Sequence, residues 1–302
     1  MLVVEGLEKR YRYVRAVRGV SFTVGEGEIV GLVGPNGAGK TTTLKSIVGL
    51  VVPDKGRILV DDVDPQRDPG IRRILGYVPE APEAPRWPRV CDFLEKLAYL
   101  EGMSKNEARR RARASAEELG LTEYCNYKVG ALSKGLRKRL LIAQSLLRER
   151  KYYVMDEPIS GLDPEWVAEV RAKIVALARE GSGVLVSSHI LRELEEIVTR
   201  VVIIRRGEVV FQGSLKELSE YAGGKTIVTI RSPNATSLAR FLAERGYTIL
   251  ATSPSMVKVE APEGETPSSI LSVVEEAGFK VEGFEYSKYS LEDAYLRLVR
   301  GG

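Results

Sequence analysis

The chain has 302 residues, of which 44% are hydrophobic and 28% are charged, a composition typical of a globular protein long enough to build two cores. Its net charge of +4 is a small excess of 45 basic over 41 acidic residues. That balance excludes proteins that coat nucleic acid or anionic lipid through a large basic surface.

The sequence also argues against export and against membrane insertion of this chain. Its start, MLVVEGLEKRY, has no basic segment followed by an apolar one, so we expect no signal peptide. No apolar run approaches the roughly 18 residues that a membrane-spanning helix needs, so the chain is not expected to form a pore by itself. Cys91 and Cys125 are far apart and belong to no C-x-x-C motif. Neither a disulfide nor a structural metal is therefore expected, in agreement with a reducing compartment.

Residues 1–217 alternate short apolar runs with helical stretches, which favours an α/β domain built on a parallel sheet. Buried strands are predicted where an apolar run precedes a turn or a helix, at residues 29–33, 152–155 and 184–187. Between about residues 90 and 148 the pattern becomes helical and predicts a subdomain inserted into the sheet domain. Residues 201–204 and 208–211, joined by a turn, predict a terminal hairpin.

A second, smaller α+β domain is predicted over residues 225–302, after a break at Tyr221-Ala222-Gly223-Gly224. Its order is β-α-β-β-α-β followed by a last helix, which is that of a ferredoxin-like unit. These elements are expected at residues 226–231, 236–245, 248–251, 256–260, 268–278, 280–286 and 291–299. Because this fold serves many functions, it indicates little about the activity.

A glycine-rich segment joins the strand at 29–33 to a helical stretch. Its sequence, Gly34-Pro35-Asn36-Gly37-Ala38-Gly39-Lys40-Thr41, fits G-x-x-x-x-G-K-[ST] in the context that this pattern requires. Glycines allow the backbone to wrap phosphate oxygens, and the N–H groups of a helix N-terminus hold negative charge. Lys40 can reach the β- and γ-phosphates, and the Thr41 hydroxyl can ligate Mg²⁺. The alternative is a glycine-rich turn with no ligand.

Two adjacent carboxylates, Asp156 and Glu157, follow the apolar run at 152–155. Adjacent side chains at a strand end point in different directions, so the two can take different roles. Asp156 is suited to the Mg²⁺ shell, and Glu157 to orienting and deprotonating the attacking water. By itself the pair could equally form a helix N-cap and turn before Pro158. Its occurrence together with the phosphate loop favours the catalytic interpretation.

A series of motifs in a fixed order makes residues 1–217 resemble the nucleotide-binding domain of ABC transporters. The phosphate loop, extended to Thr42, and the carboxylate pair belong to this series. The segment Leu132-Ser133-Lys134-Gly135-Leu136 resembles the family's LSGGQ signature and departs from it at Lys134 and Leu136. Ser160-Gly161-Leu162-Asp163 matches the family's D-loop, and His189, the only histidine of the chain, matches the switch histidine.

The resemblance implies a role for each matching residue. Ser133 and Gly135 would close over the γ-phosphate bound by another subunit, and Asp163 would lie at the dimer interface. His189 would contact the γ-phosphate and the hydrolytic water. Tyr11 resembles the aromatic residue that stacks on adenine. Tyr13 is its competitor, and either tyrosine could instead pack in a core as a strand residue.

Glu80 follows Tyr77-Val78-Pro79, where the family has a glutamine that reaches Mg²⁺ and senses the permease. A carboxylate can still serve a cation, so Glu80 is a candidate metal ligand beside Thr41 and Asp156. This substitution, the Lys-Gly-Leu of the signature and the C-terminal sequence Ser290-Leu-Glu-Asp-Ala-Tyr-Leu resemble one branch of the family. That branch is the ATPase subunits of ABC-2 type exporters, including drug and antibiotic-resistance ATPases.

By this resemblance, the chain is the ATP-binding and ATP-hydrolysing subunit of a transporter, with ATP and Mg²⁺ as cofactors. The signature lies too far along the fold to reach its own phosphate loop, so two ATPase subunits would bind ATP head to tail. They would power a separate integral-membrane permease, an exporter, from the cytoplasmic side, as peripheral subunits on the inner face of the cell membrane.

Two other functions are compatible with parts of the pattern. A non-transport ABC ATPase that acts on a soluble macromolecule usually has two nucleotide domains in one chain or a long coiled coil, and this sequence shows neither. An RNA-binding role for the second domain would call for clustered aromatic residues on its strands, which are also missing. No nucleic-acid partner is therefore expected.

Overall fold

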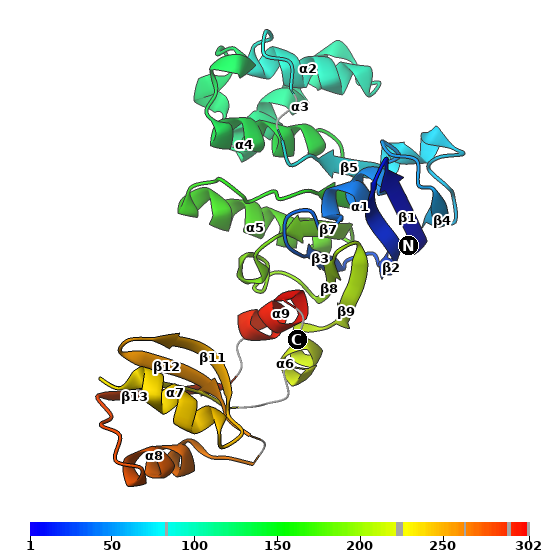
Figure 1. The fold of residues 1–302 in the computed structure, drawn as a ribbon. Coiled ribbons are helices and arrows are strands. Elements are labelled where there is room, and N and C mark those ends of the chain that lie inside the picture. Colours follow the sequence, from blue (N-terminus) through cyan, green and yellow to red (C-terminus); the bar gives the residue numbers. More distant parts are fainter. Residues whose placement is uncertain (82–83, 222–225, 263, 289–290, 301–302) are drawn as a thin grey trace. The chain divides into compact units, whose positions relative to one another are not determined.

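A computed structural model describes residues 1–81, 84–221, 226–262, 264–288 and 291–300 (Figure 1). The chain forms two compact units, Met1–Ser214 and Leu215–Gly302. Among the residues in these described ranges, no helix has the length and apolar character needed to cross a membrane. Ala222–Gly224 of the predicted break and Ser290 of the C-terminal sequence lie outside the described residues.

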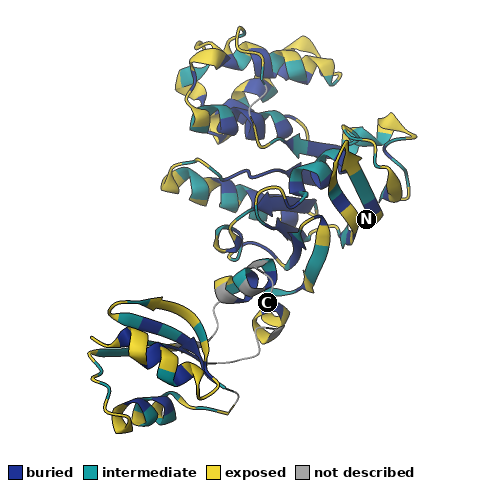
Figure 2. Ribbon diagram, in the orientation of Figure 1, coloured by how far each residue is buried: buried dark blue, intermediate teal, exposed yellow. Residues whose placement is uncertain are grey.

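A six-stranded sheet of order β5-β6-β7-β3-β8-β9 forms the centre of the first unit. Its strands are β3 (Ile29–Val33), β5 (Leu75–Val78), β6 (Tyr152–Met155), β7 (Gly183–Ser188), β8 (Arg200–Arg205) and β9 (Glu208–Gly213). All neighbours pair in parallel except β8 and β9, which form an antiparallel hairpin. Every residue of β3, β6 and β7 is buried (Figure 2), which explains their continuous apolar sequences. The three strands and the hairpin predicted from sequence are confirmed.

The strands β6, β7 and β3 are neighbours in the sheet although they are far apart in the sequence. Because parallel strands end at the same edge, the segments that follow them meet there. The amide of Gly34, after β3, donates to the carbonyl of Ser188 in β7 at 3.2 Å. The amide of Asp156, after β6, donates to the carbonyl of Val78 in β5 at 2.8 Å. The sheet topology therefore brings the phosphate loop, the carboxylate pair and His189 to one edge.

The sequence pattern does not predict the second sheet of this unit, an antiparallel sheet of order β2-β1-β4. Its strands are β1 (Leu2–Tyr11), β2 (Val14–Val24) and β4 (Lys55–Val60). Register shifts along the β1–β2 ladder interrupt the alternation of buried and exposed residues on which strand prediction depends. Apolar residues of this sheet share a core with β3 and with α1 (Lys40–Ile47). The sheet thereby holds Tyr11 beside the phosphate loop.

The helical subdomain predicted at about residues 90–148 is present between β5 and β6 (Figure 1). It contains α2 (Val90–Leu100), α3 (Lys105–Glu118) and α4 (Lys134–Ser145), and α5 (Pro164–Arg179) follows β6. Ser104 and Ser133 are the N-caps of α3 and α4, because their hydroxyls accept hydrogen bonds from amides in the first turn. Short 3₁₀ helices lie at Pro69–Ile74, Thr122–Tyr124, Val129–Ala131 and Leu191–Glu193.

Cys91 and Cys125 form a disulfide, so the expectation that they would not pair is wrong. Cys91 lies in the first turn of α2, and Cys125 ends the short helix that begins at Thr122. The amide of Cys91 donates to the carbonyl of Cys125 at 3.2 Å, which places the two backbones side by side. The cysteines are 34 residues apart in the sequence, and no periodicity between them indicates this contact.

The second unit holds a four-stranded antiparallel sheet of order β11-β12-β10-β13. Its elements are α6 (Leu215–Tyr221), β10 (Thr226–Arg231), α7 (Ala235–Ala243), β11 (Thr248–Ser253), β12 (Met256–Glu260), α8 (Pro267–Glu276), β13 (Gly283–Lys288) and α9 (Leu291–Arg300). From β10 to β13 the order is β-α-β-β-α-β, as in a ferredoxin-like unit. Leu238 and Leu242 of α7 and Ile270 of α8 pack with the strands in one core.

Two details of this unit differ from the prediction. Helix α6 is not predicted, and the last strand begins at Gly283 instead of residue 280. Gly278, with a φ of 79°, follows α8, and the next apolar residues, Phe279 and Val281, pack against the core from the connecting segment. Because apolar residues alternate with polar ones here, the sequence pattern predicts a strand, although these residues precede the first residue of β13.

Candidate functional site

The phosphate loop is a tight backbone turn between β3 and α1. A Cβ atom on Gly34 would lie 2.2 Å from the carbonyl oxygen of Ile204, and one on Gly39 would lie 2.4 Å from that of Ala16. Gly37 and Gly39 also have φ values of 77° and 107°, which side chains disfavour. No side chain caps the N-terminus of α1. The first amides of α1 are therefore available to an anion.

A cavity of about 350 Å³ lies beside this loop. It is lined by Tyr11, Val14, Ala16, Asn36, Gly37, Ala38, Gly39, Lys40, Thr41, Thr42, Glu80 and Glu157. Tyr11 is 45% exposed at its edge, whereas Tyr13 is 93% exposed and does not line it. Of the two candidate tyrosines, Tyr11 is therefore the one placed to stack on a base in this cavity.

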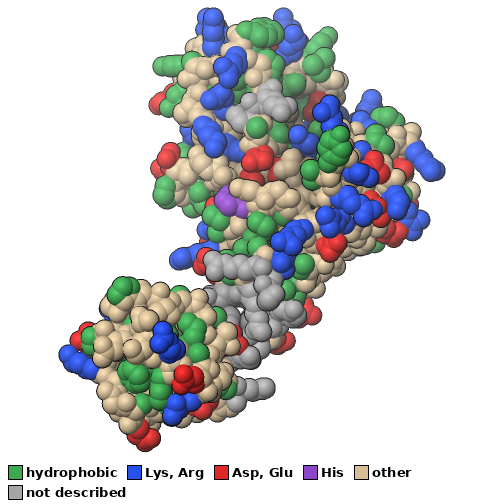
Figure 3. Space-filling view, in the orientation of Figure 1, with side chains coloured by type: hydrophobic (Ala, Val, Ile, Leu, Met, Phe, Trp, Pro, Cys, Tyr) green, Lys and Arg blue, Asp and Glu red, His purple; other side chains and the backbone are tan. Residues whose placement is uncertain are grey.

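Lys40, Glu157 and His189 form a connected, largely buried network. The Lys40 ammonium donates to the carbonyl of Gly34 at 2.7 Å and lies 3.4 Å from Oε1 of Glu157. The other carboxylate oxygen of Glu157 is 2.9 Å from Nδ1 of His189. Because an ionised carboxylate only accepts hydrogen bonds, Nδ1 is the donor in this pair. The His189 side chain is 37% exposed and is seen at the surface in Figure 3.

Glu157 has an unusual backbone conformation for a residue with a side chain. Its φ is 49°, in the left-handed region, which costs on the order of 1 to 3 kcal/mol outside glycine. The amide of Glu157 donates to the hydroxyl of Ser187 at 2.9 Å, and this bond holds the turn. The strained turn directs the carboxylate toward Lys40 and His189 instead of along the strand.

Asp156 is completely buried, and only one of its carboxylate oxygens is paired. Oδ1 accepts a hydrogen bond from the Ser187 hydroxyl at 2.6 Å. Oδ2 has no hydrogen-bond partner among the residues that the structure describes. A buried, unpaired carboxylate oxygen is costly unless a cation or water satisfies it. Sequence reasoning missed Ser187, because a serine at the end of a predicted apolar strand has no distinguishing pattern.

The oxygen donors at this edge suit a magnesium ion whose coordination shell would be completed by phosphate oxygens. Thr41 and Glu80 line the cavity, and Asp156 supplies the unpaired Oδ2. Within the described part of the chain, no group of three His, Cys, Asp or Glu side chains could hold a metal without further ligands. Mg²⁺ usually takes one or two carboxylates and completes its shell with phosphate and water, so this donor set fits it.

Lys138 of α4 is a second residue that sequence reasoning missed. Its ammonium donates to the carbonyl of Glu80 at 2.6 Å. Burial lowers the pKa of this ammonium to about 8, while the charges of Asp156, Glu80 and Glu157 act in the opposite direction. In the sequence, Lys138 is one of several basic residues in the helical stretch RKRLLIAQSLL, and nothing there marks it as buried.

The signature residues Ser133 and Gly135, and Asp163, do not line the cavity beside the phosphate loop, which we call the nucleotide cavity after the function that the resemblance implies. They form a second cluster, in which a Cβ atom on Gly135 would lie 3.4 Å from the carbonyl oxygen of Gly161. Ser133 is the N-cap of α4 and Asp163 that of α5, so two helix N-termini begin in this cluster. Their partial positive charge suits an anion.

The comparisons with known proteins bear on this arrangement. Residues 17–160 match the family model described as ABC transporter. The chain is 37% identical over 301 residues to the ABC transporter ATP-binding protein YxlF of Bacillus subtilis, an uncharacterized protein, with 99% of both chains covered. The chain belongs to the ABC transporter ATP-binding proteins.

Other relatives of this ABC ATPase agree with that assignment. It is 30% identical over 300 residues to the Nod factor export ATP-binding protein I of Ralstonia nicotianae, covering 99% of this chain and 94% of the relative. The ATP-binding subunit of an ABC transporter has a TM-score of 0.68 at 32% identity, over 74% of this chain and 93% of its own. A dimeric bacterial ABC transporter cassette has a TM-score of 0.66 at 25% identity, over 71% and 98%. The predicted family, ATPase function and P-loop fold class are confirmed.

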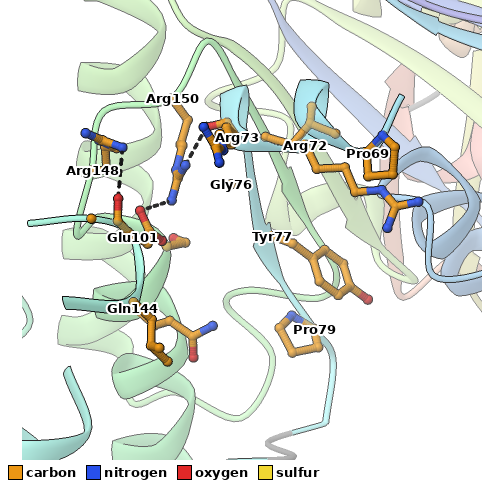
Figure 4. A pocket seen from close by; sticks show the side chains of 14 residues that line it. Pro69, Arg72, Arg73, Gly76, Tyr77, Pro79, Glu101, Gln144, Arg148 and Arg150 are labelled. Atoms are coloured by element: carbon orange, nitrogen blue, oxygen red, sulfur yellow. Dashed lines mark hydrogen bonds and ion pairs between the residues drawn. The ribbon is translucent and has the colours of Figure 1, made fainter. Parts of the chain in front are cut away.

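The ABC ATPase has a larger cavity, of about 650 Å³, between β5 and the helical subdomain. We call this cavity the arginine groove, because four arginines line it: Arg72, Arg73, Arg148 and Arg150 (Figure 4). Glu101 is the only acidic side chain drawn there. Arg150 forms an ion pair with Glu101, and Arg148 donates to the Glu101 carbonyl at 3.3 Å. The groove therefore carries a net positive charge.

Replacing Lys40 with Ala should weaken ATP binding about tenfold to a hundredfold, because charge-assisted hydrogen bonds to phosphate are lost. Calorimetric titration of the ABC ATPase with ATP measures the effect. Lys45→Ala is the matched control, since Lys45 lies on α1 but does not line the nucleotide cavity. Equal affinities of wild type and Lys40→Ala would exclude a phosphate contact by Lys40.

Proposed function

We propose that this subunit hydrolyses ATP in the cavity beside the phosphate loop and thereby drives a separate membrane permease that exports its substrate. The observation that carries the proposal is the meeting of Lys40, Glu157 and His189 at the sheet edge where Asp156 keeps an unpaired oxygen. Export is supported by the relative named for Nod factor export. The alternative, an ATPase that acts on a soluble macromolecule, has no comparable support.

In the reaction, Glu157 acts as general base. A water oxygen attacks the γ-phosphorus and its proton passes to the Glu157 carboxylate. The bond from the γ-phosphorus to the bridging oxygen breaks, and ADP departs with the electron pair. A triphosphate competes for the Lys40 ammonium, which otherwise lies 3.4 Å from Oε1 of Glu157. Phosphate binding thus releases the carboxylate oxygen that the water requires.

Three further groups support this chemistry. The hydrogen bond from His189 fixes the second oxygen of Glu157 and so orients the carboxylate. Mg²⁺, held by Asp156 and Thr41 with Glu80 nearby, would neutralise charge on the phosphate oxygens. The ring of Tyr11 would stack on the adenine at the edge of the cavity.

The complete site requires a second copy of the ATPase subunit. Ser133, Gly135 and Asp163 lie outside the nucleotide cavity of their own chain, yet they begin helices whose N-termini suit an anion. A head-to-tail dimer gives each signature segment the γ-phosphate bound by the other subunit. The dimeric cassette of the same fold supports this arrangement.

The arginine groove is the face that we assign to the permease. Its occupant would be a short cytoplasmic segment of the permease that carries acidic side chains, because the groove holds four arginines and one glutamate. Charge complementarity of this kind selects the partner and speeds its docking. The subunit would then act at the cytoplasmic face of the membrane through this contact.

Reversing two charges of the groove, Arg73→Glu with Arg148→Glu, should weaken binding to permease-containing vesicles roughly tenfold to a hundredfold, since like charges then face each other. Co-sedimentation with vesicles that contain the candidate permease measures binding. Arg110→Glu, an exposed arginine of α3 outside the groove, is the control. Equal sedimentation of all three proteins would show that the permease binds at another face.

The proposed function itself has a separate test. It would be overturned if the wild-type protein did not hydrolyse Mg-ATP.

A further inference from the structure

Lys138 has a place in the fold that neither catalysis nor nucleotide binding accounts for. Its side chain is only 2% exposed. The ammonium donates to the carbonyl of Glu80 at 2.6 Å, to that of Pro79 at 3.3 Å and to that of Asp156 at 3.5 Å. An ammonium has three protons to donate, so three backbone carbonyls satisfy it completely.

These contacts join three segments that are distant in the sequence. Pro79 and Glu80 follow β5, and Asp156 follows β6. Lys138 itself lies in α4, which begins at the signature residue Ser133. One side chain therefore connects the helix of the signature to the backbone of two acidic residues at the nucleotide cavity of the same chain.

Stability alone does not explain a lysine at this position. Burying an ammonium removes its hydration, and a well-packed apolar side chain of similar size is often at least as stabilising. An apolar residue, however, could pack in the same space without holding any carbonyl. What the lysine adds is a directional contact: it makes the orientation of the peptide groups at Glu80 and Asp156 depend on the position of α4.

We propose that Lys138 is a positioning residue that couples the signature segment to the nucleotide cavity of the same subunit. When the signature engages the nucleotide of the partner subunit, a shift of α4 moves the carbonyls that Lys138 holds, and with them Glu80 and Asp156. Each of the two sites in a dimer is thereby adjusted by the state of the other. The coupling rests on the proposed function.

The test replaces Lys138 with Met, which retains the chain length without the ammonium. The kcat for Mg-ATP should fall roughly tenfold to a hundredfold, because misplaced catalytic groups cost rates of that order. The KM for ATP should stay within about twofold, since the phosphate loop and Tyr11 are untouched. A merely structural residue would not separate kcat from KM in this way.

A second readout does not depend on turnover. Hydrogen exchange of the nucleotide-free protein, followed in the peptide that contains Glu80, should become roughly tenfold faster in Lys138→Met as the loop loses its anchor. Arg139→Met is the matched control. Arg139 is also a buried cation of α4, but it stacks on the ring of Trp166 at 3.8 Å and should leave this peptide unchanged.

Lys138→Gln guards against a failure of the Met variant to fold, because its amide keeps two donors. It should show the same two changes in smaller measure. A wild-type kcat in either folded variant, or equal changes in Arg139→Met, would overturn the coupling. That outcome differs from failure of the proposed function, in which the wild-type protein would not hydrolyse Mg-ATP.

Discussion

Replacing Glu157 with Gln should reduce ATP turnover at least about a hundredfold, because a positioned general base contributes a factor of that order. ATP affinity should change by no more than about threefold, since the amide leaves Lys40 and the backbone amides of the phosphate loop in place. The loss of the negative charge near Lys40 even removes a competitor for that ammonium, which lies 3.4 Å from the carboxylate. Phosphate release and calorimetric titration measure the two quantities on the same preparation.

The matched control is Glu196→Gln, which removes an exposed carboxylate that pairs with Arg171 instead of a group of the cavity. Its turnover should equal that of the wild type. A Glu157→Gln protein that hydrolyses ATP at the wild-type rate would show that another group takes the proton. A protein that neither binds nor hydrolyses ATP would point to collapse of the left-handed turn at residue 157.

With Mg-ATP, the Glu157→Gln protein should change from a monomer to a dimer. The signature residues Ser133 and Gly135 do not line the cavity beside the phosphate loop of their own chain, and in the proposed dimer ATP held by the partner would supply their anion. Two ATP molecules at a symmetric interface would each be bound by charge-assisted hydrogen bonds from both chains. Wild-type protein should form the dimer only briefly, because hydrolysis removes the phosphate that joins the subunits. Analytical ultracentrifugation with and without Mg-ATP follows the change.

Adding Ser133→Arg to Glu157→Gln should abolish the dimer, because the long side chain fills the space of the phosphate. This substitution also removes the N-cap of α4, at a cost of about 1 kcal/mol. Ser104→Arg separates the two effects, since Ser104 is the N-cap of α3 in the same way. It should lower stability similarly and leave dimerisation intact. A dimer that forms equally well without ATP, or that survives Ser133→Arg, would exclude the nucleotide as the link.

Sequence reasoning located the parts of the site whose chemistry depends on residues that are consecutive in the chain. Gly34 and Gly39 approach backbone carbonyls so closely that only glycine fits, and this constraint produces a glycine pattern that can be recognised in the sequence. The buried strands are equally predictable from the sequence, because a parallel strand covered on both faces is apolar throughout. The side-by-side order of β6, β7 and β3 then brings the motifs together.

The parts that sequence reasoning missed depend on contacts between distant segments. Ser187 holds both Asp156 and the amide of Glu157, but a serine at the end of an apolar strand has no distinguishing pattern. Lys138 is buried because carbonyls from two other segments surround it. The Cys91–Cys125 pair, wrongly expected to be unpaired, likewise depends on the contact between the first turn of α2 and the end of the short helix at Thr122–Tyr124. The roles of the individual site residues stay predictions until the variants are measured.

The position of β7 has a consequence for the order of events during synthesis. This strand lies between β6 and β3, although the ribosome makes it after both. Until residues 183–188 emerge, the growing chain has a gap in the middle of its sheet, and Ser187 and His189 do not yet exist. The phosphate loop, complete by residue 41, must wait for pairing across more than a hundred residues, which makes folding slow. A ligand stabilises the state that binds it, so ATP at the phosphate loop should stabilise the sheet only after β7 has joined it.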